Sequence, residues 1–169
     1  MMKILIIGTI DGNYGNREEP LCEKLRVGLK KLGHETELCF LPFRRDALNA
    51  AEQILAYRMV DSSGADALVT VGYPACFIPS TKKVSYLFDI YPEIHENFSF
   101  KLREHRVEER LKMAEKITSA ESRVFREANS VFTADDALNS IMRDRYGVRS
   151  TVLKPSATDL AKRVECALL

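Results

Sequence analysis

Two carboxylates follow an apolar run in "VSYLFDIYPEIHENF", where Asp89 and Glu93 stand among aromatic residues. A buried strand has no use for charge, so these side chains are expected at a strand end that faces a ligand. Carboxylate oxygens accept hydrogen bonds from sugar hydroxyls, and Tyr91 offers a ring that can stack on a sugar face. The alternative is that Asp89 caps a turn or helix beside a surface Glu93. His95 lies just beyond, and a lone histidine gives no reason to assign proton transfer.

A glycine-containing segment, "GTIDGNYGNREE", follows the first apolar run and precedes an expected helix. Gly8, Gly12 and Gly15 let the backbone approach a ligand closely, and the N–H groups at a helix start suit a phosphate. The spacing is neither G-x-G-x-x-G nor G-x-x-x-x-G-K-[ST], which argues against an NAD-binding enzyme. A flexible turn is an equally open interpretation.

Two further strand ends carry candidate residues. Gly72 and Pro74 break the chain in "VGYPACFIPS". Thr133 ends a later run and is a candidate for ligand contact, whereas Asp135 behind it is expected to cap a helix. No Ser-His-Asp order, zinc-ligand spacing or acid–base pair stands out. The sequence therefore favours neither a hydrolase nor a metal site.

Short apolar runs alternate with helical periodicities from end to end. Most runs are continuous, as in strands covered on both faces, and strands are expected over 3–7, 36–40, 67–71, 84–88, 130–133 and 150–153. Helices are expected from Leu21, Leu25, Leu29 and Leu32 between Pro20 and Gly33, from Ala47, Ala51, Ile54 and Leu55, over 135–145 before Gly147, and over 156–169. This alternation predicts one domain over 1–169, a doubly wound, Rossmann-like α/β fold with a mostly parallel sheet.

The stretch 99–128 predicts a longer helix. Its apolar stripe is thin and consists of Leu102, Leu111, Ala114, Ile117, Val124 and Phe125. Its charges are mixed, and two interpretations are open. The first is a solvated face of i,i+4 ion pairs. The second is that 101–126 forms a basic surface that touches anionic lipid or a partner helix.

Composition excludes several classes of protein. The 169 residues are 46% apolar and 29% charged with a net charge of +1, which disfavours nucleic-acid binding. No run reaches the length of a signal-peptide core or a membrane span. The four scattered cysteines lie in apolar contexts and are expected to be reduced and buried, namely Cys22, Cys39, Cys76 and Cys166. A cytoplasmic protein is expected.

In their order, these segments resemble the N-terminal domain of a GT-B glycosyltransferase, with most similarity to the retaining family 4. "MKILIIG" begins the series, and "LKKLGHETEL" resembles the family's L-x-x-x-GHEV-x-V. "ADALVTVGYP" is similar to D-V-V-x-x-x-x-P, and "FDIYPE" is similar to D-L-W-P-E. "ANSVFTADDALNSIMRDRYGVRSTVLKPSATD" resembles A-D-x-V-I-x-x-S-x-x-x-x-x-x-L-x-x-x-Y-G followed by V-x-P-N-G-V-D. The resemblance spans about residues 2–159.

The resemblance implies the acceptor-side half of a retaining enzyme that uses a nucleotide-diphosphate sugar and no tightly bound cofactor or metal. The loop with Gly12, Asn13 and Gly15 would approach the donor phosphates. Asp89, Glu93, Tyr91, Tyr73 and Thr133 would line the sugar and acceptor cleft. The family's donor-binding C-terminal domain has no counterpart here. The expected partners are therefore that domain or a separate subunit, together with the sugar acceptor.

The sequence also departs from the family. "PSATD" stands in place of P-N-G-V-D, Phe88 stands where many members have histidine, and Thr133-Ala134 precedes Asp135 where a serine often opens the helix. Two other interpretations stay open. One is a non-catalytic partner subunit of the same fold, and the other is a flavodoxin-like signalling domain.

Overall fold

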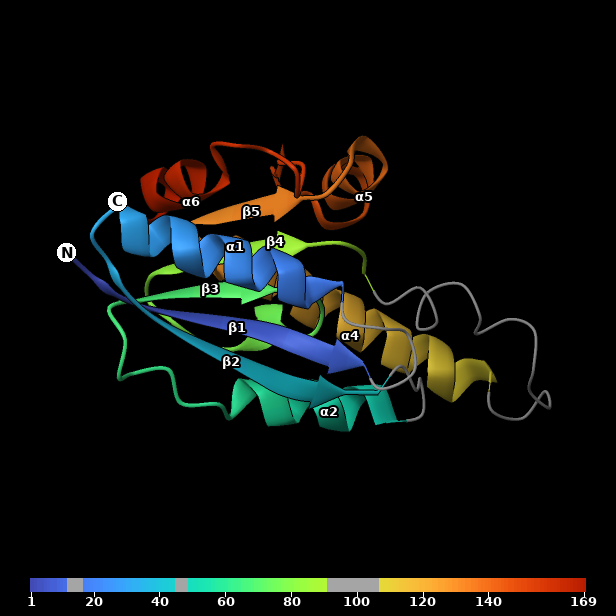
Figure 1. The fold of residues 1–169 in the computed structure, drawn as a ribbon. Helices are drawn as coiled ribbons and strands as arrows, with labels where there is room; N and C mark the ends of the chain where they lie inside the picture. Colours follow the sequence, from blue (N-terminus) through green and yellow to red (C-terminus); the bar gives the residue numbers. More distant parts are fainter. Residues whose placement is uncertain (12–16, 45–48, 91–106) are drawn as a thin grey trace.

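A computed structural model of the protein describes residues 1–11, 17–44, 49–90 and 107–169. Its centre is a six-stranded sheet in which all neighbouring strands run parallel, in the order β2-β1-β3-β4-β5-β6 (Figure 1). The fold is a doubly wound, Rossmann-like α/β fold, as predicted. Within the described ranges, no helix has the length and apolar character needed to cross a membrane.

All six predicted strands are confirmed. Their bounds are β1 Lys3–Asp11, β2 Glu35–Phe43, β3 Ala67–Val71, β4 Lys83–Leu87, β5 Ser130–Thr133 and β6 Thr151–Val152. β3 and β5 have the predicted limits because they are short, continuous apolar runs buried on both faces. β1 and β2 are longer than their apolar runs because they pair with each other from Lys3–Glu35 to Asp11–Phe43.

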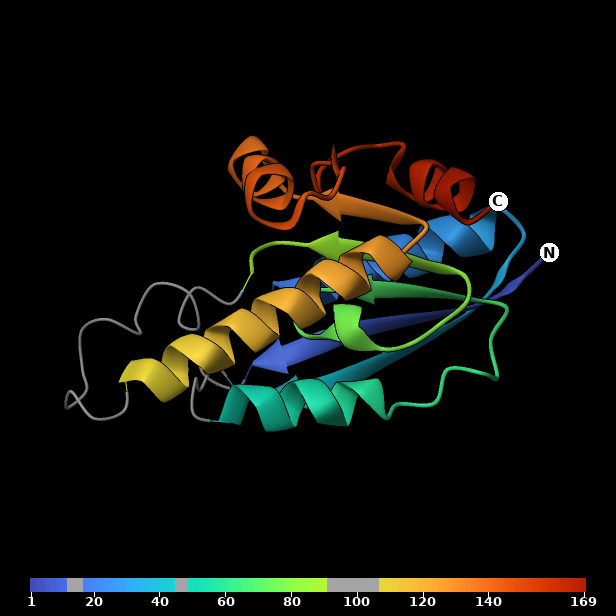
Figure 2. The same ribbon diagram turned by 180° about the vertical axis from the view of Figure 1, so that it is seen from behind.

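Helices cover both faces of the sheet, and the two views show which ones share a face (Figures 1 and 2). One face is covered by α1 Glu18–Lys31 and α6 Leu160–Leu168. The other is covered by α2 Ala50–Arg58, the short 3-10 helix η2 Ala75–Phe77, α4 Val107–Glu127 and α5 Asp136–Tyr146. The predicted long helix is thus confirmed over 107–127, and its expected start lies outside the described residues.

Local signals explain where helices begin and end. Asp135 caps α5 as predicted, because its Oδ1 accepts a hydrogen bond from the Leu138 N–H at 2.8 Å. Gly33, with φ of 91°, ends α1: its own N–H bonds to the Lys30 carbonyl, and the His34 N–H bonds to the Leu29 carbonyl. This is the left-handed glycine stop expected from the sequence.

The core lies in two layers on either side of the sheet. Leucines of α1 and α6 pack on Ile4, Ile6 and Val69, and each fully buried aliphatic side chain contributes roughly 1.5–3 kcal/mol. The other layer contains two buried charged residues, Lys83 and Glu121. Glu121 lies on α4, so this helix does more than present a solvated face of ion pairs.

α6 is fastened to α1 and to the start of the sheet. Gly28 of α1 faces Ala161 of α6 at close range. The Lys24 ammonium donates to the carbonyl oxygens of Pro155 and Ala157, both at 2.8 Å. The His34 ring accepts the Met2 N–H at Nδ1, so Nε2 carries the proton and donates to Glu165 at 2.7 Å.

The expectation that all four cysteines are buried is wrong for two of them. Cys22 and Cys76 are buried, but Cys39 and Cys166 are exposed, because β2 is an edge strand and Cys166 lies on the outward side of α6. The second predicted helix is confirmed as α2, and Leu55, one of the residues that mark it, has an exposed side chain. α2 instead packs through Ala50, Ile54 and Tyr57.

Candidate functional site

The strand order reverses between β1 and β3. The chain passes from β1 to β2 on the face of α1, and from β2 back to β3 on the face of α2. In open parallel sheets, ligands bind outside the carboxyl ends of the strands at such a switch point. The candidate site is therefore the edge of the sheet formed by the carboxyl ends of β1, β3 and β4. We call it the carboxyl edge.

Three residues converge on this edge at the end of β3. Gly72 has φ of 85°, which favours glycine. A Cβ on Gly72 would lie 2.9 Å from Thr9 Oγ1 and 3.1 Å from Glu18 Oε1. Thr9 belongs to β1 and Glu18 opens α1, so a hydroxyl and a carboxylate meet beside a backbone that has no side chain. Neither Thr9 nor Glu18 was a sequence candidate.

An ion pair joins the start of α1 to the end of β4. Arg17 Nη2 lies 2.5 Å from Asp89 Oδ2, with the arginine half-exposed and Asp89 about one-quarter exposed. The guanidinium carbon also lies 5.4 Å from the centre of the Phe88 ring, which packs on Tyr86. Asp89 thus lies at the edge, as predicted, and its partner is a residue that sequence reasoning missed. The signal was the charged run "NREE", which spans the start of α1.

Tyr73 is placed in the core rather than along the edge. It is 4% exposed and packs edge-on against Phe43 and Phe77, with ring centres 6.2 Å and 5.5 Å apart. Burial, followed by the nearby carboxylate of Glu121, raises the pKa of Tyr73 well above its usual value. Its hydroxyl is therefore held neutral inside the protein and does not line a cleft.

Thr133 ends β5 at the same edge of the sheet but is fully buried. Its Oγ1 has no hydrogen-bond partner within the described ranges, a state that costs roughly 1–3 kcal/mol in a dry site. The backbone around it is paired, since the Ala134 N–H bonds to Leu87 and the Leu153 N–H to the Thr133 carbonyl. The Thr133 side chain is therefore not exposed to a ligand at the carboxyl edge, although its backbone ends β5 there.

The remaining candidates lie outside the described residues. They are Gly12, Asn13 and Gly15 of the predicted phosphate loop, and Tyr91, Glu93 and His95 beyond Asp89. Gly8, at the start of the same glycine-rich segment, lies inside β1. A Cβ there would be 2.7 Å from the Phe40 ring and 2.9 Å from Cys22 Sγ, so its role is close packing.

Charge decides what the described part of the edge can bind. Glu18 and Glu19 lie in the first turn of α1, where carboxylates already offset the positive end of the helix dipole. With Asp89 they outnumber the one cation near them, Arg17. An anion is disfavoured at this point, whereas donors such as sugar hydroxyls or an ammonium group are favoured. The described residues contain no cluster of three or more side chains suited to a metal ion.

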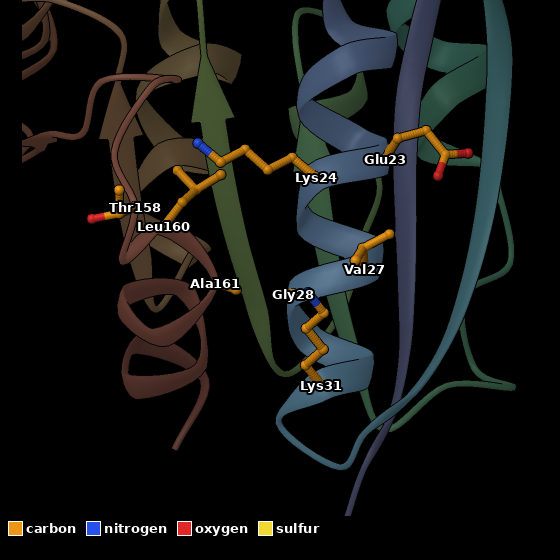
Figure 3. Close-up of a pocket in the computed structure, with 8 residues that line it drawn as sticks. All are labelled: Glu23, Lys24, Val27, Gly28, Lys31, Thr158, Leu160 and Ala161. Carbon is orange, nitrogen blue, oxygen red and sulfur yellow. The ribbon is translucent and has the colours of Figure 1, made fainter.

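A surface groove of about 470 Å³ lies along the line where α1 meets α6 (Figure 3). Val27, Gly28 and Ala161 form its apolar wall. The Lys24 ammonium beside them is engaged by the two carbonyl oxygens of the following loop. The groove thus presents few polar groups that converge on one point, and it is a weaker candidate than the carboxyl edge.

Comparison with known proteins adds no assignment. No model of a known protein family matches the chain. No curated protein matches it either. The fold, the carboxyl edge and the sequence motifs are therefore the features that bear on function.

Proposed function

We propose that the chain is the acceptor-side half of a retaining glycosyltransferase, which moves a sugar from a nucleotide-diphosphate donor to a glycan, lipid or small-molecule acceptor. Support comes from the ordered motifs that resemble family 4 and from the switch point that the fold provides. The observation that carries the proposal is the Arg17–Asp89 pair beside Glu18, Thr9 and Gly72. Asp89 and Glu18 offer carboxylate oxygens on a partly exposed wall, and the buried Thr9 hydroxyl lies beside Glu18. Such acceptor oxygens suit recognition of hydroxyls.

In this proposal Asp89 accepts a hydrogen bond from an acceptor hydroxyl and fixes its orientation. Arg17 holds the carboxylate in place, and the guanidinium packs over the Phe88 ring. Correct orientation of the attacking hydroxyl is worth a large part of the rate in transfer reactions. The acidic wall is a poor place for the donor diphosphate. The donor is therefore assigned to the loop with Gly12, Asn13 and Gly15 and to an opposing domain or subunit.

The test is sugar transfer by the protein together with its donor-binding partner. Nucleotide sugars and candidate acceptors are screened by mass spectrometry, and the active pair is then used for kinetics. Asp89→Asn and Arg17→Gln should each lower kcat/KM for the acceptor by about 10- to 100-fold, while the KM for the donor changes little.

Asp159→Asn and Arg163→Gln are the matched controls. Asp159 and Arg163 form an ion pair of 2.7 Å at the start of α6, away from the carboxyl edge, and both side chains are about half exposed. These variants should retain the unchanged rate. Transfer at the unchanged rate by Asp89→Asn, or no transfer with any nucleotide sugar, would contradict the proposal.

A flavin-binding domain is the second candidate, because the order β2-β1-β3-β4-β5 is also that of flavodoxin-like proteins. Flavin mononucleotide would place its phosphate near the start of α1, where Glu18 and Glu19 disfavour it. Visible absorption from a flavin that copurifies with the protein would favour this candidate. Absence of both transfer and flavin binding would leave the non-catalytic partner subunit.

A further inference from the structure

Figure 2 shows α2 and α4 in front of the sheet, on the face opposite to α1 and α6. Residues of these two helices line a second hollow. Its volume is about 280 Å³. Ile54, Phe77 and Val124 form an apolar floor, and Arg58, Lys116 and Arg123 form the rim. An adjoining open hollow shares Arg123 and continues along α4 toward Arg126. We call the two together the α2–α4 groove.

The groove is strongly basic for a protein of net charge +1. Four cationic side chains line it, and Glu127 is the one carboxylate among its lining residues. Glu127 is already engaged by Arg58 at 3.2 Å. Lys116 and Arg123 are exposed and, in the part of the chain that the structure describes, have no carboxylate partner. Two uncompensated cations therefore stand above an apolar floor.

The same two helices also expose large apolar side chains. Leu55 of α2 is 62% exposed, Met59 directly after α2 is 78% exposed, and Met113 of α4 is 42% exposed. A basic rim next to exposed aliphatic side chains is typical of surfaces that rest on the headgroup region of a membrane. A free phosphate would satisfy the cations alone, and it would leave the apolar side chains in water.

We propose that the α2–α4 groove binds the phosphate headgroup of an anionic lipid, with Lys116 and Arg123 at the phosphate. Leu55, Met59 and Met113 would then contact the upper acyl region. This contact is independent of the carboxyl edge and of the proposed function, since it uses different residues on another part of the molecule. The sequence predicted a basic surface over 101–126. The proposal assigns the lipid contact to two cations of that stretch, Lys116 and Arg123, and adds apolar contacts from α2.

The first test is sedimentation of the whole chain with vesicles of phosphatidylcholine alone or mixed equally with phosphatidylglycerol. We expect binding only to the mixed vesicles, and weaker binding at high salt. Lys116→Gln/Arg123→Gln should weaken binding about 30-fold, since each basic residue near an anionic surface contributes about fivefold. The control Lys30→Gln/Lys162→Gln removes the same charge from exposed positions on α1 and α6 and should bind as the unchanged protein does.

The second test separates a lipid from a free phosphate. Leu55→Ser/Met59→Ser should weaken vesicle binding, whereas Val27→Ser, an exposed valine on α1, should not. In an NMR titration, inorganic phosphate should cause only small shifts of the resonances around Lys116 and Arg123. Leu55→Ser/Met59→Ser should leave these shifts unchanged. The proposal is overturned if vesicles are not bound, if both charge variants weaken binding equally, or if inorganic phosphate binds as strongly as the vesicles do.

Discussion

Gly28 and Ala161 bring α1 and α6 into contact with no room for a further atom. A Cβ on Gly28 would lie 2.5 Å from the Ala161 Cβ. Gly28→Ala is expected to destabilise the protein by about 1–3 kcal/mol through overpacking, although alanine is the better helix former by about 1 kcal/mol. Urea denaturation measures the change. Gly28→Ala/Ala161→Gly restores the space and should recover most of the loss. A stabilising Gly28→Ala would show that the two helices are further apart.

Glu121 is a buried carboxylate that receives a hydrogen bond from the Tyr146 hydroxyl at 2.9 Å and interacts with Tyr73. Glu121→Ala should cost about 2–4 kcal/mol, because it leaves a cavity and removes the partner of a buried hydroxyl. Glu121→Gln keeps an acceptor oxygen and should cost less. The exposed Glu115→Ala, on the same helix, should change stability by less than about 0.5 kcal/mol. Equal losses for Glu121→Ala and Glu115→Ala would contradict the buried cluster.

Alkaline pH should unfold the protein through its buried tyrosines. Burial raises the pKa of each of the four tyrosines in the described ranges, namely Tyr57, Tyr73, Tyr86 and Tyr146. Above the ordinary pKa of about 10, the unfolded chain releases protons that the native protein keeps, so stability falls as pH rises. Each buried tyrosine lowers the free energy of unfolding by up to about 1.4 kcal/mol per pH unit above pH 10.

The measurement is tyrosinate absorbance beside circular dichroism in a Tyr14→Phe/Tyr91→Phe background, which removes the two tyrosines outside the described residues. We expect both signals to change together above pH 10. Tyr57→Phe in the same background should make the free energy of unfolding fall less steeply with pH, because one buried tyrosine fewer takes up the proton difference. Tyrosinate that forms near pH 10 while the circular dichroism stays native would contradict these burials.

Thiol labelling should divide the cysteines into two pairs. Cys39 and Cys166 are exposed and should react rapidly at neutral pH. Burial raises the pKa of Cys22 to about 12 and also raises the pKa of Cys76, so both should react only on unfolding. Titration with Ellman's reagent should show two fast thiols, and Cys39→Ser/Cys166→Ser should remove the fast phase. A fast phase that survives this double change would show that Cys22 or Cys76 is accessible.

The sequence predicted the sheet well because most strands are buried on both faces and read as continuous apolar runs. β3 and β5 needed no tertiary information. The extra length of β1 and β2 depended on their mutual pairing, which polar residues and Pro42 conceal in a single sequence. Capping was also readable, because Asp135 and Gly33 act within one helical turn of the chain.

The site was harder to predict because its contacts join residues far apart in sequence. Arg17 and Asp89 are separated by 72 positions, and nothing local indicates that they meet. Tyr73 follows Gly72 at a strand end and was expected in the cleft. After Gly72 the chain instead turns into the core layer under α2, η2 and α4, which places the Tyr73 ring against Phe43 and Phe77. The partners of Tyr73 come from three other elements, so its burial is a tertiary property.

The bond from His34 to Glu165 holds the last helix beside the first residues of β1, so both chain ends lie at the edge of the sheet from which the strands start (Figure 1). A sensor chip or bead linked to either end would therefore leave the strand tips pointing outward into the solution. Immobilised in this way, the protein can be offered sugars, nucleotides or vesicles without the support blocking the surfaces under test.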